Sequence, residues 1–193
     1  MEIRKAGVND SDPIAECLFL AMEDIVYHFL KSRDRAQGAQ FMRRLVGLGG
    51  NQYSYENCWV LVENGTVLAA ACLYDGALLE MLRRPVAAFV HTNYGLDFNP
   101  ENETGAGEIY LDTLGVLEQH QGKGLGKMLL KFLIDTYVNG EGKVIGLLVD
   151  KENPGAKKLY LRVGFSVVGE KKLAGKTMEH LQVGNRAGAQ TFE

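Results

Sequence analysis

The stretch that decides the fold reads Ile109-Tyr110-Leu111-Asp112-Thr113-Leu114-Gly115-Val116, then four residues, then Gln121-Gly122-Lys123-Gly124-Leu125-Gly126-Lys127. The first run is strand-like, whereas the residues after the glycines keep the apolar spacing of a helix. A glycine-rich turn between a strand and a helix exposes unpaired amides and a partial positive charge at the helix N-terminus. Because such a turn attracts phosphate, and Lys123 and Lys127 add charge, we expect it to bind a pyrophosphate.

Two other phosphate-binding loops do not fit the spacing of this turn. A dinucleotide-binding GxGxxG motif that begins at Gly122 needs glycine where Lys127 stands. A P-loop that ends in Gly126-Lys127 needs glycine at Gln121 and serine or threonine at Met128. A glycine-rich turn without a ligand stays the alternative to a pyrophosphate site.

The residues after the turn predict a strand-helix-strand unit with parallel strands. The apolar residues from Leu125 keep helical spacing up to a predicted stop near Asn139-Gly140. Val144 to Val149 is almost entirely apolar, which is typical of a strand covered on both faces. Asn153-Pro154 then combines an N-cap with proline at the first helical position. Two closing strands are expected at Phe165 to Gly169 and at Thr177 to Val183.

The first half of the chain predicts two helices and a hairpin. Asp10-Ser11-Asp12-Pro13 supplies an N-cap for a helix, and a second helix is expected through Gln40 to Leu48. Cys58 to Val62 and Thr66 to Leu73 are strand-like runs. The Asn64-Gly65 pair between them favours a tight turn.

The segment from Asp75 to Gly107 is long for a connection within one domain. It contains an apolar, helix-like stretch that we expect to break at Pro85, followed by the polar run from Asn99 to Gly105. Connections of this length are usually functional covers or mobile loops, and the sequence does not decide between them.

Length and composition predict one ordinary α/β domain over residues 1–184, with residues 185–193 as a flexible tail. The net charge of -3 and the pI near 5.9 give no general attraction for a phosphodiester backbone, so nucleic acid is not an expected partner. Cys17, Cys58 and Cys72 lack the paired spacing of metal or redox motifs and suit a core.

No membrane segment and no metal site are expected. The N-terminus lacks the pattern of a signal peptide and no apolar run approaches about 18 residues, so we expect a cytoplasmic location. The four histidines do not cluster in sequence with acidic residues or cysteines. They are His28, His91, His120 and His180.

Two signatures resemble those of the GNAT superfamily of N-acetyltransferases. The cofactor motif of the family reads Gln or Arg, two residues, Gly, one residue, then Gly or Ala, which here matches Gln121, Gly124 and Gly126. The second signature is an Asn that opens a helix ending in Leu-Tyr, three residues, Gly-Phe. Its positions here are Asp150, Asn153, Ala156, Leu159-Tyr160 and Gly164-Phe165.

The resemblance implies a mixed α/β fold with a central sheet of about seven strands flanked by helices. Two splayed parallel strands, here Ile109 to Val116 and Val144 to Asp150, would hold the pantetheine arm of acetyl-CoA. Leu114, Gly115 and Val116 would contact it through backbone groups, and the Val116 amide would polarise the thioester carbonyl. The pyrophosphate would lie against Gln121, Gly122, Lys123, Gly124, Leu125, Gly126 and Lys127.

The resemblance also implies two groups near the reacting atoms. Asn153 either reaches the cofactor or only caps its helix. Tyr160 would protonate the departing CoA thiolate, because a phenol with a reference pKa of about 10 still carries its proton at neutral pH. The alternative is that Tyr160 is a buried aromatic residue on the apolar face of its helix.

A general base must help the amine, because a lysine-like amine with a pKa of about 10.4 is mostly charged at pH 7. Asp112 is the first candidate, since it lies in the cofactor strand shortly before Val116, and Glu108 at the mouth of the strand is the second. Some members of the family place Glu near the positions of Tyr110 and Asp112. Asp112 could equally be a structural, hydrogen-bonding residue.

The sequence therefore predicts an acyltransferase that uses acetyl-CoA, without a metal, to acetylate a primary amine of a small molecule or of a protein. A non-catalytic acyl-CoA sensor and an interaction scaffold are the alternatives. Family members are often dimers, so a homodimer is expected. The amine, the preferred acyl chain and the role of Asp75 to Gly107 are not fixed by the sequence.

Overall fold

The computed structural model describes residues 1–184 and is built on a seven-stranded mixed sheet of order β1-β2-β3-β4-β5-β7-β6. All neighbouring strands are antiparallel except β4 and β5, which are parallel. This arrangement confirms the expected mixed sheet. The strands are β1 (Glu2–Lys5), β2 (Cys58–Glu63), β3 (Thr66–Asp75), β4 (Ile109–Val116), β5 (Ile145–Asp150), β6 (Ser166–Leu173) and β7 (Lys176–Val183).

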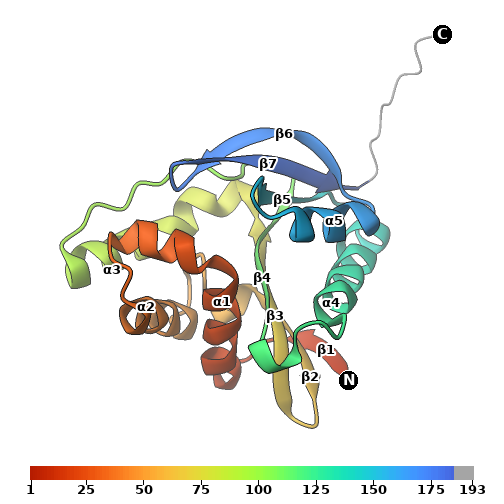
Figure 1. The fold of residues 1–193 in the computed structure, drawn as a ribbon, viewed down its shortest axis with the longest axis horizontal. Helices are drawn as coiled ribbons and strands as arrows, with labels where there is room; N and C mark the ends of the chain where they lie inside the picture. The colour runs from red at the N-terminus through yellow and green to blue at the C-terminus, as the bar shows by residue number, and fades with distance from the viewer. Residues whose placement is uncertain (185–193) are drawn as a thin grey trace.

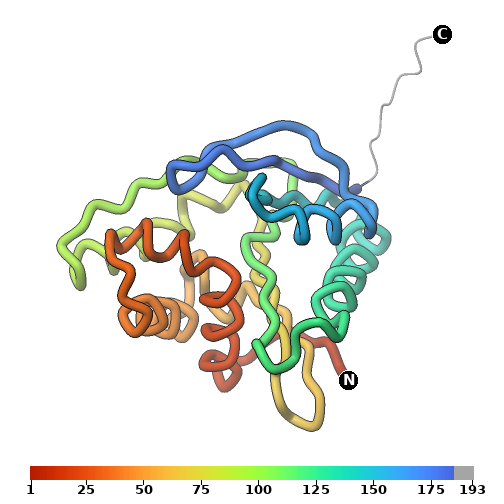
Figure 2. The backbone as a smooth tube through the Cα atoms, in the orientation of Figure 1, coloured from red at the N-terminus to blue at the C-terminus, as the bar shows by residue number. Residues whose placement is uncertain are grey.

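Helices cover both faces of the sheet (Figures 1 and 2). Buried side chains of α1, α2 and α3 form one apolar cluster with one face. On the other face, buried side chains of α4 and partly buried ones of α5 pack with β5. The helices are α1 (Ser11–Leu30), α2 (Arg35–Gly47), α3 (Leu79–Tyr94), α4 (Leu125–Leu133) and α5 (Pro154–Arg162), and α4 continues as a π-helical turn over Ile134–Gly140.

The two parallel strands part almost as soon as they meet. Ile109 pairs with Ile145 and Tyr110 with Gly146, and the described ladder between β4 and β5 ends there. The strands therefore splay, as the family resemblance implied. Beyond Tyr110, the edge of β4 that faces β5 is left without a strand partner.

A β-bulge marks the place where β4 leaves its neighbour. The register between β3 and β4 moves from Cys72↔Thr113 to Leu73↔Leu111, which leaves Asp112 without an opposite residue. Bulges of this kind bend a strand and change the direction of a side chain. Asp112 is thus set apart from the regular alternation of β4.

Local sequence signals explain most element boundaries. Asn64 and Gly65 turn the β2–β3 hairpin with φ values of 51° and 79°, as their sequence predicts. The expected start of the second helix at Gln40 is wrong, because Asp34 accepts hydrogen bonds from the amides of Ala36 and Gln37 and α2 begins at Arg35.

The predicted break at Pro85 is also wrong, since α3 continues through it. A proline inside a helix removes one backbone hydrogen bond, which here would have gone to the carbonyl of Met81. Met81 is exposed, so water can take that bond. Burial of Val86 and Val90 on the other side of Pro85 keeps the helix together.

The structure describes residues 1–184, and a single domain over these residues stays a prediction. The predicted tail, residues 185–193, lies outside the described residues. Within residues 1–184, no helix is both long enough and apolar enough to cross a bilayer.

Gly115 allows α1 to lie directly on β4. A Cβ atom at this position would stand 1.9 Å from the carbonyl oxygen of Cys17, which is backbone and cannot turn away. We expect Gly115→Ala to lower the free energy of unfolding by about 1–3 kcal/mol through overpacking, measured by urea denaturation. Gly47→Ala is the control, since no atom lies within 4 Å of its Cβ position, and equal effects in both variants would contradict this explanation.

Candidate active site

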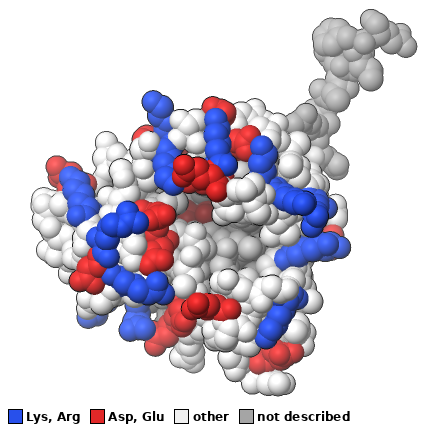
Figure 3. Space-filling model, in the orientation of Figure 1, with Lys and Arg blue, Asp and Glu red and all other residues white. Residues whose placement is uncertain are grey.

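A pocket of about 760 Å³ opens between α1, the splayed strands and the N-terminal end of α5. The space-filling view shows the hollow near the centre of this face, with acidic side chains along its rim (Figure 3). Among the residues predicted from sequence, those that line the pocket are Asp112, Leu114, Asn153 and Tyr160.

Helix α1 reaches the pocket through a kink. Met22 leaves the helical conformation with φ -130° and ψ 27°. Residues Leu20 to Ile25 line the pocket on both sides of the kink. The Sδ atom of Met22 lies 3.3 Å from Thr113 Oγ1, so the kink is in contact with β4.

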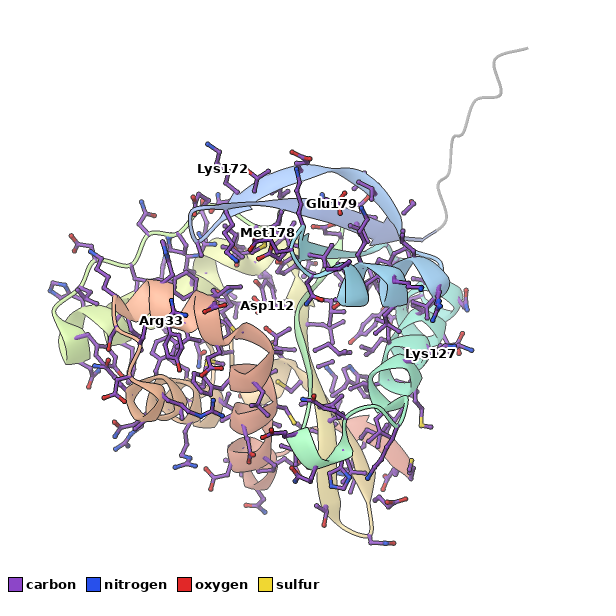
Figure 4. All side chains as sticks on the ribbon, viewed as in Figure 1. Arg33, Asp112, Lys127, Lys172, Met178 and Glu179 are labelled. Atoms are coloured by element: carbon purple, nitrogen blue, oxygen red, sulfur yellow. The ribbon has the colours of Figure 1, made fainter. Side chains whose placement is uncertain are left out.

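Asp112 is held at the inner end of the pocket by neutral donors. Its Oδ2 accepts hydrogen bonds from Gln52 Nε2 (2.8 Å) and Tyr74 OH (3.0 Å), and its Oδ1 accepts one from Thr113 Oγ1 (2.8 Å). Burial raises the pKa of Asp112 above its ordinary value, and the three hydrogen bonds offset only part of that rise. In Figure 4, Asp112 lies near the middle of the molecule, between Arg33 and Lys127.

Asp112 differs from the other carboxylates that line this pocket. Each of the others has an ion-pair partner, whereas Asp112 has none among the described residues. A buried carboxylate without a cationic partner is an attractive place for an ammonium group. The ion pairs at the other carboxylates are Glu23–Arg35, Asp24–Arg33, Glu103–Arg83, Asp150–Lys176 and Glu152–Lys176.

A polar network that was not predicted from the sequence lies behind Asp112. Gln52, Arg83 and Glu103 are buried, and both Gln52 and Glu103 line the pocket. Burial, together with the charge of Asp112, raises the pKa of Glu103. No local signal marks Arg83 in the sequence, because Glu80 and Arg84 are charged neighbours in the same stretch.

Tyr160 projects from α5 into the pocket. Its ring packs edge-on against Phe165, with the ring centroids 5.7 Å apart. Burial raises the pKa of Tyr160 to about 12, so the hydroxyl keeps its proton at neutral pH. No side chain in residues 1–184 forms a hydrogen bond with this hydroxyl, which leaves it available to a ligand.

Glu108, the second candidate base, lies outside the pocket. Its carboxylate accepts hydrogen bonds from Thr104 Oγ1 (2.7 Å) and Gln182 Nε2 (2.7 Å), and it lies 2.9 Å from His180 Nε2. Burial alone would raise the pKa of Glu108, but these hydrogen bonds together hold it below its ordinary value. The carboxylate fills the space that a Cβ at Gly146 would need, so it joins β4, β5 and β7.

The glycine-rich turn has the backbone that its sequence predicts. Gly122 and Gly124 adopt φ values of 76° and 78°, which residues with a side chain rarely adopt, and α4 begins directly after Gly124. Lys123 and Lys127 are exposed beside the turn. The turn therefore presents helix amides and two cationic side chains to an anion.

At the C-terminal end of β4, backbone groups face the gap between β4 and β5. The amide of Leu117 donates to the carbonyl of Leu68 on β3 (3.0 Å). Because successive residues of a strand alternate between its two sides, the amide and the carbonyl of Val116 point toward the side of β5. Gln121 Nε2 donates to the Val116 carbonyl (3.1 Å) and so joins the turn to this edge.

Asn153 caps α5 in this structure. Its Oδ1 atom accepts a hydrogen bond from the amide of Ala156 (3.0 Å), which accounts for asparagine at this position. Its place at the pocket rim leaves the second role, contact with a cofactor, as a prediction. Within the described part of the chain, no three His, Cys, Asp or Glu side chains are grouped so that they could hold a metal ion.

The match to a known protein family shows which family this chain belongs to. Residues 26–165 match the family described as the acetyltransferase (GNAT) family. The chain belongs to this family. The match spans the splayed strands, the glycine-rich turn and Tyr160, which are the features that form the candidate site of this GNAT chain.

Several known proteins are similar to this GNAT chain. A Bacillus subtilis spermine/spermidine N(1)-acetyltransferase is 37% identical over 84 residues, which cover 43% of this chain and 55% of that protein. The chain thus matches about half the length of this curated relative. A solved acetyltransferase is 29% identical with a TM-score of 0.75, covering 94% of this chain and 98% of its own.

Two further structures share the fold at lower identity. A Staphylococcus aureus N-acetyltransferase is 20% identical with a TM-score of 0.81, covering 95% of this chain and all of its own. A Salmonella typhimurium acetyltransferase solved with its cofactor acetyl-CoA is 20% identical with a TM-score of 0.55, covering 100% and 99%. GNAT proteins of this shape are thus known with acetyl-CoA bound.

The environment of Glu108 predicts a pH-dependent contribution to stability. Its folded pKa is depressed, so the stabilisation is complete above the ordinary value of 4.5 and is lost as the pH falls through the folded pKa. We expect Glu108→Gln to lower the free energy of unfolding by about 2 kcal/mol at pH 7 and by less at pH 3, measured by urea denaturation. Glu118→Gln, at an exposed position, is the control. An equal loss of unfolding free energy in Glu108→Gln at pH 7 and at pH 3 would contradict the explanation by the depressed pKa of Glu108.

Proposed function

We propose that this protein transfers the acetyl group of acetyl-CoA to a primary amine of a small, polycationic molecule. The observation that carries this proposal is Asp112, a pocket carboxylate without an ion-pair partner at the point where β4 and β5 part. Tyr160 lines the same pocket from the other side of the split. A base and a proton donor are thus available on opposite sides of one cavity.

The thioester substrate would lie in the split between β4 and β5. Its pantetheine arm suits the backbone edge of Leu114 to Val116, and its pyrophosphate suits the turn from Gln121 to Lys127. The Val116 amide points to the side from which the thioester carbonyl would approach. A donor placed where negative charge develops is worth about 2.7–4 kcal/mol in mutational tests.

Asp112 would receive the proton of the acceptor ammonium group. Its raised pKa makes it a stronger base than an exposed aspartate. The neutral amine then attacks the thioester carbonyl carbon, so that a C–N bond forms and the C–S bond breaks. Tyr160 gives its hydroxyl proton to the departing sulfur, and the second proton that the attacking nitrogen loses restores the Tyr160 hydroxyl through solvent.

The acceptor is best supported as a small linear polyamine. The curated Bacillus subtilis relative is named for spermine and spermidine, and the pocket of this chain carries six acidic side chains against two basic ones, Arg33 and Lys176. Asp112 lies at the inner end of the pocket, which a thin amine reaches more easily than a folded protein surface. A protein amino group as acceptor, a homodimer and a cytoplasmic location stay predictions.

Binding of the acetyl donor is the first test. We expect acetyl-CoA to bind saturably in a calorimetric titration, while NADPH and ATP, run as controls for generic phosphate binding, do not. Acetyl-CoA binding without CoA release in the presence of any amine would favour the sensor alternative. No binding at millimolar acetyl-CoA would contradict the proposal and favour the scaffold.

Removal of the base should act on chemistry rather than on donor binding. We expect Asp112→Asn to lower kcat/KM for spermidine by about 100-fold or more, because the amine loses its proton acceptor. The affinity for acetyl-CoA should stay the same. Asp24→Asn is the matched control, since Asp24 lines the pocket but is exposed and paired with Arg33. Equal losses of kcat/KM in both variants would show that Asp112 is not the general base.

Replacing Tyr160, the proposed proton donor, should affect the kinetic constants differently from replacing Asp112. We expect Tyr160→Phe to lower kcat by about 100-fold at neutral pH, with little change in KM, because the thiolate leaves without a proton. CoA release measured with a thiol reagent over a range of pH values gives both constants. An unchanged kcat would show that Tyr160 is only a packing residue.

A further inference from the structure

A second buried carboxylate stands beside the proposed base. Glu103, 3% exposed, lies on the segment between α3 and β4 and lines the same pocket. Gln52 Nε2 donates to Glu103 Oε1 (2.7 Å) and to Asp112 Oδ2 (2.8 Å). One side-chain amide therefore bridges two carboxylates that come from segments far apart in the chain.

The orientation of Gln52 is explained by this bridge. An amide group carries two N–H donors, and the two carboxylates take both. The Oε1 atom of Gln52 is buried and has no partner in the described residues. An unsatisfied buried acceptor costs about 1–3 kcal/mol. The two hydrogen bonds to the carboxylates therefore hold the Gln52 amide in this orientation, although its oxygen has no partner. The reverse orientation would place Oε1 against carboxylate oxygens.

Arg83 fixes Glu103 in this position. Its Nη2 atom forms a buried ion pair with Glu103 Oε2 and also donates to the carbonyl of Glu101 (3.1 Å). Its Nη1 atom donates to the carbonyl of Pro100 (3.0 Å) and to Asn102 Oδ1 (2.8 Å). One guanidinium group from α3 thus fastens residues 100–103 to the rear of the pocket.

Asp112, Glu103 and Arg83 form a cluster in which the charges do not cancel. Two carboxylates face one guanidinium group, and the other titratable groups packed against them are the neutral Tyr53, Tyr74, Tyr110 and Cys72. Burial raises the pKa of each of the three phenols, so they stay uncharged at neutral pH. Besides burial and its own hydrogen bonds, Asp112 therefore meets two charged groups in this cluster, Glu103 and Arg83, whose charges act on its ionisation in opposite directions.

We propose that Glu103 is a positioning residue of the acetyl-transfer site, which acts on Asp112 through the side-chain amide of Gln52 and is itself fixed by Arg83. Its negative charge keeps Asp112 basic enough to take a proton from the acceptor amine. The segment before β4 is thereby part of the active site. This inference rests on the proposed function, because it gives Glu103 a task in the same reaction.

The test is Glu103→Gln, which keeps the shape of the side chain and one accepting oxygen but removes the charge. The carboxyl carbon of Asp112 is followed by 13C NMR titration of the full chain, and the pH profile of kcat/KM is measured with spermidine. We expect the pKa of Asp112 to fall by about one pH unit, since a like charge is lost and Arg83 is left without its partner. The acidic limb of the profile should move by the same amount.

A matched control and a second variant keep the result unambiguous. Glu101→Gln changes an exposed carboxylate in the same segment and should leave the pKa of Asp112 unchanged. Gln52→Met removes the bridge but leaves Glu103 and Arg83 in place. Asp112 then loses a donor, so its pKa should rise, opposite to the effect of Glu103→Gln.

The outcomes separate this inference from the proposed function. If Glu103→Gln lowers only the melting temperature and the pKa of Asp112 does not move, Glu103 is structural and the inference is overturned. Should Glu103→Gln not fold, Gln52→Met decides, and an unchanged pKa of Asp112 there overturns the inference as well. If the pKa shifts as expected but the wild-type protein acetylates no amine, the coupling stands and the proposed function fails.

Discussion

The separation of β4 from β5 after two residue pairs is the constraint on which the rest of the site depends. A continuous parallel ladder would use the backbone groups of Leu114 to Val116 and would leave no pocket between the strands. The bulge at Asp112 coincides with this separation and sets that carboxylate apart from the alternation of β4. The glycine-rich turn then brings the N-terminus of α4 to the far end of the same strand. One departure from regular pairing thus creates a slot for an extended ligand and places chemical groups along it.

Signals that lie close together in sequence allowed much of this to be predicted. The turn from Gln121 to Lys127, the Asn153 cap and the Asn64-Gly65 hairpin each depend on a few neighbouring residues, and the structure shows all three features. Two predictions failed for local reasons. Asp34 was missed as an N-cap, and burial beyond Pro85 outweighed the loss of one hydrogen bond in α3.

The network behind Asp112 could not be predicted in this way. Gln52, Arg83 and Glu103 come from a loop, a helix and a long connection, and only the tertiary fold brings them to Asp112. None of the three has neighbours in sequence that mark it as part of a site. The same limit applies to Glu108, whose place near the start of β4 fits a base, although its contacts with Thr104, His180 and Gln182 turn it away from the pocket.

The kink at Met22 divides α1 into two parts with different freedom to vary. Before the kink, the backbone of Cys17 touches Gly115, so changes there disturb β4 directly. Beyond the kink, Glu23, Asp24, Ile25 and Tyr27 line the pocket, and the carboxylates of Glu23 and Asp24 pair with Arg35 and Arg33 near the surface. Under the proposed function, the choice of amine could therefore be changed through the second part of α1, while the strand that would hold the acetyl donor keeps its shape. The part of α1 that packs on β4 and the part that lines the pocket are thus separable along the length of one helix.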